Sequence, residues 1–105
     1  MQSNKKDDTL FLIPETDLVA STIEKTRNFF WDELKKNSDA HHNIILDVQG
    51  IEVVDSLGVN LIIGLYRQIN SEHKNFSIIN GGKKFMKIAS FFRFPTLFTV
   101  KAEEE

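Results

Sequence analysis

A change of pattern between residues 44 and 69 constrains the fold of this chain more than any other feature. Ile44–Val48 is a nearly continuous apolar run, which is typical of a strand covered on both faces. Four apolar residues then recur at helical spacing and are expected to face a core: Leu57, Leu61, Leu65 and Ile69. The polar pair Asp55-Ser56 therefore lies where a buried strand gives way to a helix. Backbone N–H groups are unpaired at such a position, and a serine hydroxyl can face solvent there.

Strands and helices are predicted to alternate along the whole chain. Apolar runs ended by Pro14 and Gly81 predict further strands at 9–13 and 75–80, and the apolar run after Pro95 predicts a last short strand at 97–100. Helical periodicity predicts helices from about 17 to 36 and from 85 to 92. Short links between alternating elements favour a partly parallel sheet built from right-handed crossover units. We predict one small α/β domain over residues 9–101, with a mixed, mostly parallel sheet of about four strands and helices mainly on one face. The polar ends, 1–8 and 102–105, are expected to be flexible.

The periodicity also predicts which residues of the outer helices are buried. The first helix is expected to begin after the capping side chains of 15–17 and to bury one face: Val19, Ile23, Thr26, Phe30 and Leu34. In the last helix, Phe85 and Phe92 are expected in the core. Phe91 and Met86 fall off that face, which indicates either self-association or packing at an edge.

Composition excludes several classes of function. The chain has 105 residues, a net charge of −2 and no cysteine, so it has no disulfide framework and no thiolate nucleophile or thiolate zinc site. Basic residues are scattered among acidic ones, which argues against a nucleic-acid partner. No apolar run approaches the ~20 residues of a membrane span. Residues 1–8 lack the apolar core of a signal peptide, and a cytoplasmic location is expected.

Catalytic and metal-binding patterns are weak, and we expect no cofactor and no enzyme activity. His41 and His42 are adjacent and point apart on an extended chain, so a solvated loop is favoured over a metal pair. Ser56, Asp55 and either His42 or His73 supply the residue types of a hydrolase triad. The sequence around Ser56 is not Gly-x-Ser-x-Gly, so a hydrolase is not favoured. Asp47 ends a strand and is interpreted as structural, with a site at the carboxyl end of that strand as the alternative. Gly81-Gly82-Lys83-Lys84 lacks the spacing of a nucleotide-binding loop and is interpreted as a turn with solvated lysines.

The central segment resembles the STAS family, which comprises the anti-sigma factor antagonists and the related domain of sulfate transporters. The resemblance rests on a buried strand ending in Asp, a spacer, and Asp-Ser-x-Gly opening a helix: Ile44–Val48, Val53–Val59, Leu61 and Leu65. It extends from about Leu10 to Val100.

Two departures from the family pattern stand near the N-terminus. The family's Gly-x-x-Asp reads Pro14-Glu15-Thr16-Asp17 here, so Asp17 matches the acid while Pro14 predicts a different turn. The family's first strand is expected to be shortened or absent, because residues 1–8 are polar.

The resemblance implies a phosphorylation switch with Ser56 as the phosphoacceptor. In such proteins a serine kinase that doubles as an anti-sigma factor phosphorylates this serine. The unphosphorylated form binds the kinase and frees the sigma factor, and a phosphatase resets the switch. The chain would then be a kinase substrate that acts by partner switching in signal transduction and transcription regulation. The alternative within the fold is a non-catalytic accessory subunit of a transporter or a scaffold in stress signalling. The alternative from another class is a small hydrolase or nucleotide-binding enzyme.

A stripe on the helix after Ser56 is the predicted partner-binding surface. At 100° per residue, Asn60, Ile63 and Arg67 lie within about a quarter turn of Ser56. Val59 and Tyr66 adjoin this stripe. Alternatively, Val59, Ile63 and Tyr66 pack under the neighbouring helix. The predicted contact residues together are Asp17, Asp55, Ser56, Val59, Asn60, Ile63 and Arg67.

Overall fold

Five strands form one mixed sheet in the order β1-β2-β3-β4-β5 within the computed structural model, which describes residues 1–37 and 40–104. The strands are β1 (Gln2–Lys6), β2 (Thr9–Ile13), β3 (Asn43–Asp47), β4 (Asn75–Gly81) and β5 (Thr99–Ala102). β1 is antiparallel to β2, and the other neighbouring pairs are parallel. The mostly parallel α/β architecture is confirmed, with one strand more than predicted.

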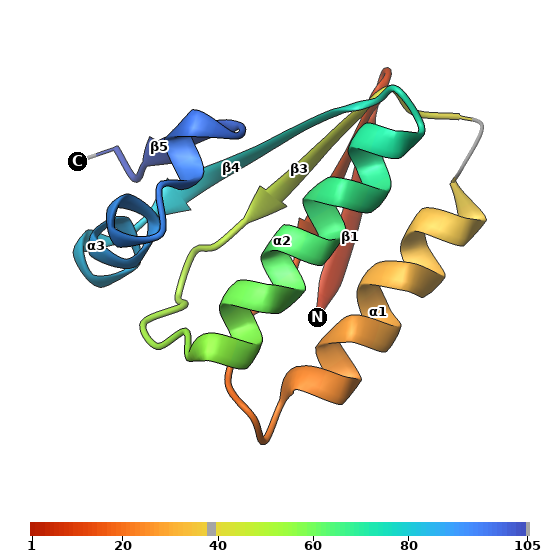
Figure 1. The fold of residues 1–105 in the computed structure, drawn as a ribbon. Helices are drawn as coiled ribbons and strands as arrows, with labels where there is room; N and C mark the ends of the chain where they lie inside the picture. The colour runs from red at the N-terminus through yellow and green to blue at the C-terminus, as the bar shows by residue number, and fades with distance from the viewer. Residues whose placement is uncertain (38–39, 105) are drawn as a thin grey trace.

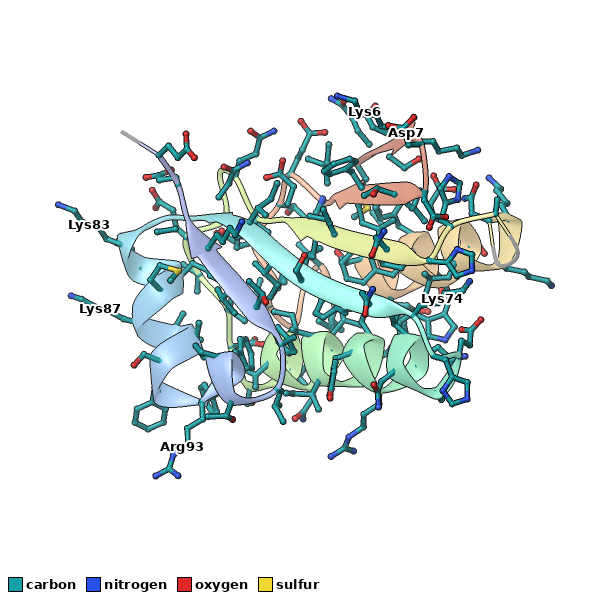
Figure 2. All side chains as sticks on the ribbon, turned by 90° about the horizontal axis from the view of Figure 1, so that it is seen from above. Lys6, Asp7, Lys74, Lys83, Lys87 and Arg93 are labelled. Atoms are coloured by element: carbon teal, nitrogen blue, oxygen red, sulfur yellow. The ribbon has the colours of Figure 1, made fainter. Side chains whose placement is uncertain are left out.

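The helices lie on one face of the sheet, as predicted. They are α1 (Ile23–Lys36), α2 (Ser56–Ser71), α3 (Lys83–Phe91) and the short 3₁₀ helix η1 (Phe94–Thr96). In Figure 1, α1 and α2 run side by side in front of the strands. From above, the strands lie over α2 and α3 (Figure 2).

The expectation that both faces of β3 are covered is wrong: Ile44 and Leu46 are buried under the helices, while Ile45 points to the open face and is half-buried.

The N-terminal strand is present, which corrects the expectation that it is shortened or absent. β1 pairs with β2 from Gln2 opposite Ile13 to Lys6 opposite Thr9. A two-residue turn, Asp7-Asp8, joins the two strands. Asp7 has a φ of 54°, a left-handed conformation that Asp tolerates. An edge strand needs only one covered side, and lysines on an edge oppose pairing with another sheet, so a polar sequence suits this position.

Helix α1 begins six residues after Asp17, later than predicted. Thr22 precedes its first turn, and its Oγ1 donates to the carbonyl oxygen of Asp17 at 2.6 Å. Asp17 does not cap this helix, because its carboxylate binds the loop before α2. Of the predicted face, Thr26 and Phe30 are fully buried, whereas Val19 lies outside the helix.

The core between helices and sheet contains most of the predicted residues, with two exceptions. Phe85 is fully buried as predicted, and α2 buries Leu61, Leu65 and Ile69. Leu57 and Phe92, both predicted in the core, are exposed. The buried face of α2 differs from the predicted one only at its start, where Gly58 takes the inward position in place of Leu57.

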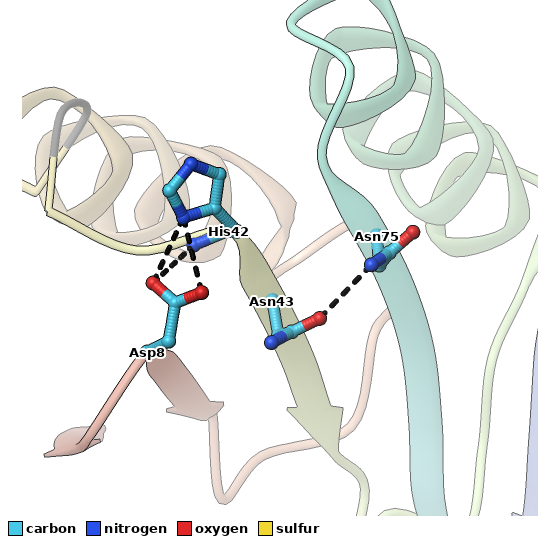
Figure 3. Close-up of polar contacts among 4 residues, drawn as sticks. All are labelled: Asp8, His42, Asn43 and Asn75. Carbon is cyan, nitrogen blue, oxygen red and sulfur yellow. Dashed lines mark hydrogen bonds and ion pairs between the residues drawn. The ribbon is translucent and has the colours of Figure 1, made fainter.

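The two histidines before β3 differ in their surroundings. His42 is exposed, and its Nδ1 lies 2.9 Å from Oδ1 of Asp8, with the carboxylate facing the ring in Figure 3. This hydrogen bond lowers the pKa of Asp8. Near this pair, the side-chain amide of Asn75 donates a hydrogen bond to Asn43 Oδ1 at 3.0 Å and links β4 to β3 (Figure 3). His41 is buried, which corrects its assignment to a solvated loop, and among the described residues its Nδ1 has no hydrogen-bond partner.

Candidate functional site

The loop from β3 to α2 lies at the carboxyl ends of the parallel strands (Figure 1). Asp47 ends β3, and its Oδ1 accepts hydrogen bonds from the backbone N–H of Gln49 and from Nδ2 of Asn80, each at 3.0 Å. The carboxylate is therefore used to hold the first turn of the loop, which agrees with its interpretation as structural.

Asp55 is the N-cap of α2. Its Oδ1 accepts from the backbone N–H of Gly58 at 3.0 Å, and its Oδ2 accepts from that of Ala20 at 2.8 Å. The N–H of Gly58 is the main cause that lowers the pKa of Asp55, those of Ala20 and Leu57 add to it, and desolvation opposes it. One side chain thus starts the helix and also fixes the loop before α1.

Asp17 makes the reciprocal connection from the other loop. Its Oδ1 accepts from the backbone N–H groups of Glu52 at 2.9 Å and Val53 at 3.1 Å. The neighbouring residue, Leu18, donates its N–H to the carbonyl oxygen of Val53 at 3.0 Å and accepts from the N–H of Asp55 at 3.1 Å. Two aspartates and a short parallel bridge between Leu18 and Val54 therefore join the two loops.

Gly58 is required by the close approach of these loops. A Cβ at this position would overlap the carbonyl oxygen of Leu18 and lie 2.8 Å from Cγ1 of Val54. The absence of a side chain here therefore lets the start of α2 approach the loop before α1.

Ser56 is the first residue of α2 and is exposed. Its hydroxyl forms no hydrogen bond with any residue in the described part of the chain. The two neighbouring side chains differ. The carboxylate of Asp55 accepts hydrogen bonds from two backbone N–H groups, whereas the side chain of Leu57 is exposed. The serine therefore stands at the rim of a rigid loop with its hydroxyl open to a second molecule.

The stripe predicted along α2 is only partly on the surface. Asn60 and Arg67 are exposed, whereas Ile63 and Tyr66 are partly buried against the core. Val59 is 6% exposed and belongs to the core, so its expected place on the surface stripe is wrong. The alternative interpretation, packing, holds for Val59 and in part for Ile63 and Tyr66.

Two exposed apolar residues close to the serine in sequence were not expected on the surface. Val53 is 49% exposed and Leu57 is 45% exposed. The signal for Val53 was the pair Val53-Val54, since adjacent residues of an extended segment point in opposite directions and Val54 is buried. Glu52 completes the rim, and its Oε2 lies 3.7 Å from Nζ of Lys84 at the start of α3.

The residue types of a hydrolase triad are not brought together. His73 follows the C-terminus of α2, about 24 Å along a sixteen-residue helix from Ser56. His42 precedes β3, at the opposite end of the sheet from the loop. Within residues 1–37 and 40–104, no three side chains of His, Asp or Glu are grouped as metal ligands, and no helix has the length and apolarity to cross a membrane.

Comparisons with known proteins agree with this architecture. The family model described as the STAS domain matches residues 1–105. The solved structure of a candidate anti-sigma factor antagonist from Thermotoga maritima superposes with a TM-score of 0.84 at 20% identity, covering 95% of this chain and 84% of that one. The anti-sigma factor antagonist SpoIIAA in its unphosphorylated form gives 0.68 at 17% identity, covering 99% and 88%. SpoIIAA of Bacillus in its phosphorylated form gives 0.70 at 19% identity, covering 98% and 91%. These likenesses establish the fold. No curated protein matches the chain in sequence.

Proposed function

Because the chain belongs to the STAS domain family, we propose that it is a regulatory binding protein of the anti-sigma factor antagonist type, switched by phosphorylation of Ser56. In this proposal a partner serine kinase, which also acts as the anti-sigma factor, binds the unphosphorylated protein in the cytoplasm and phosphorylates it. A serine phosphatase restores the first state. The protein is a substrate and a ligand in this cycle and catalyses no step.

The observation that carries the proposal is the position of Ser56. It is exposed at the start of α2, its hydroxyl has no partner among the described residues, and the Asp55 cap fixes the backbone around it. A kinase can reach such a hydroxyl without opening the fold.

A phosphate on Ser56 is expected to change the surface and to leave the scaffold intact. It adds about 1.5 to 2 negative charges at neutral pH, and a helix N-terminus favours negative charge. The same charge would stand next to the exposed Leu57 and a few residues after the exposed Val53 and Glu52. A partner surface matched to apolar contacts and a neutral serine would meet both bulk and repulsion, so docking is lost without refolding.

The proposed contact surface follows from exposure. It comprises Val53, Ser56, Leu57, Asn60 and Arg67, with the outer part of Ile63. Asp17 and Asp55 support this surface through their hydrogen bonds to backbone N–H groups. Bacillus SpoIIAA, which has the same fold, is known in phosphorylated and unphosphorylated forms, which is consistent with a fold that tolerates the modification.

Affinity capture from the native host with two variants of Ser56 tests the proposal. Ser56→Ala is expected to retain the kinase, and Ser56→Asp is expected to lose it. Ser71→Asp is the matched control, because it places the same charge on an exposed serine at the other end of α2 and should retain the kinase. Equal capture of the kinase by Ser56→Ala and Ser56→Asp would refute the switch.

A further inference from the structure

A groove beside α3 lies outside the surface assigned to the switch. One wall is the helix, with Lys83, Met86, Lys87 and Phe91, and the other is the end of the chain, with Ala102 and Glu103. The cavity measures about 790 Å³. Met86 and Phe91 are the large apolar side chains among the residues that line it.

Phe91 is the most exposed large apolar side chain among the described residues. It is 80% exposed, and its ring packs edge-on against Phe92 with the ring centres 5.0 Å apart. Helix α3 ends at Phe91, and Arg93 in the turn after it adopts a left-handed conformation with a φ of 59°. An exposed aromatic side chain next to an apolar hollow is a common anchor point in protein interfaces.

The α3 wall of the groove is positive, although the chain as a whole is slightly acidic and Glu103 places one carboxylate on the opposite wall. Residues 83–93 contain four cationic side chains and no acidic one. Lys84 is paired with Glu52, but in the part of the chain that the structure describes Lys83, Lys87 and Arg93 form no ion pair. These three side chains project into solvent from α3 and from the turn after it (Figure 2).

We propose that this groove docks an acidic segment of a second protein that carries a bulky apolar side chain. The apolar side chain would fill the hollow between Met86 and Phe91, and flanking carboxylates would meet Lys83 and Lys87 on the α3 wall and Arg93 in the turn after the helix. The concave shape favours a protruding segment over a flat membrane surface. The proposal is independent of Ser56, so the protein would hold one partner at α3 while the switch at α2 is in either state.

A titration of the ¹⁵N-labelled protein with a synthetic peptide tests this. The probe is the capped peptide Asp-Glu-Leu-Phe-Glu-Asp, and the control is the same peptide with serines in place of Leu and Phe. We expect the probe to shift the amide signals of α3 and of Ala102 and Glu103, and the control peptide to bind at least about tenfold more weakly. Phe91→Ser and Lys87→Glu should each weaken binding of the probe by a similar factor. Arg27→Glu on α1 makes the same charge change as Lys87→Glu away from the groove and should leave binding unchanged.

Three results would overturn the proposal. One is the absence of peptide-induced shifts in α3, or equal shifts with the serine peptide. Another is binding to phosphatidylglycerol vesicles that Phe91→Ser abolishes, without binding of the peptide, which would assign the surface to a membrane. The third is a concentration-dependent dimer that Phe91→Ser dissociates, which would assign it to a second copy of the chain. None of these results bears on Ser56, so the two proposals fail separately.

Discussion

Gly58 of α2 lies directly against the backbone of Leu18, in the loop before α1. A Cβ at position 58 would overlap the carbonyl oxygen of Leu18, and that same oxygen accepts the N–H of Asp55. The first turn of α2 is thus held at backbone contact with a segment about forty positions away in the chain. This contact fixes the direction in which Ser56 faces.

Gly58→Ala is expected to destabilise the protein by about 1 to 3 kcal/mol, since backbone must shift to accept the methyl group. Urea unfolding followed by circular dichroism would measure it. Gly64→Ala is the control, because a Cβ there meets nothing within 4 Å and the change should stabilise α2 by up to about 1 kcal/mol. An unchanged stability of Gly58→Ala would show that the two loops are not held in contact.

Asp17→Ala is expected to lower stability by about 1 kcal/mol, because the N–H groups of Glu52 and Val53 lose their acceptor. Amide hydrogen exchange at these two residues should accelerate. Asp17→Asn keeps a side-chain oxygen and should lose less. If exchange at Glu52 and Val53 is the same in Asp17→Ala as in the unchanged protein, the proposed tie between the loops is absent.

The cap at Asp55 predicts a pH dependence of stability. Because hydrogen bonds from Gly58 and Ala20 lower its pKa in the folded state below the ordinary 3.8, the unfolded chain takes up the proton first as pH falls. The charged cap therefore contributes its full stability above about pH 5, and the contribution is lost as pH falls through 3.8 to the lower folded value.

Asn is also a good cap residue, so the variant Asp55→Asn isolates the effect of the charge on stability. Chemical unfolding at several pH values should show a gap between the two proteins that is widest near neutrality and closes in acid. A gap that is constant with pH would contradict this account.

Leu57→Ser is expected to weaken binding of the captured kinase by at least about tenfold, because it removes an exposed apolar contact beside Ser56. Its stability should change by no more than about 0.5 kcal/mol. Leu97→Ser is the matched control, since Leu97 is 43% exposed on another element. Isothermal titration with the purified kinase would compare them. Equal loss in both variants would mean that Leu57 has no special part in docking.

The alternation of strands and helices was sufficient to predict the parallel part of the sheet and the place of Asp55-Ser56. It did not predict β1, because an edge strand such as Ser3 to Lys6 has no apolar periodicity, although the two-residue turn at Asp7-Asp8 was a signal. The start of α1 was misplaced because Asp17 has the residue type of a helix cap, while its actual acceptors lie in a distant loop.

The details of the site depended on packing that a sequence pattern does not contain. α2 is apolar on more than one side, so the periodicity fitted a core face through Leu57 as well as the observed face through Gly58. The difference is confined to the first turn, where Val59, predicted on the surface, is buried and Leu57, predicted in the core, is exposed. The pair Val53-Val54 indicates that one of the two faces outward, and the bridge between Leu18 and Val54 decides that it is Val53.

Phosphopeptide mapping of the protein purified from its native host, with and without phosphatase treatment, tests the central claim most directly. The account predicts a single phosphate on the peptide that contains Ser56, absent after phosphatase treatment and absent from Ser56→Ala, in a protein with an unchanged circular dichroism spectrum. A phosphate confined to another residue, or a modified Ser56 that leaves binding of the kinase undiminished, would contradict it.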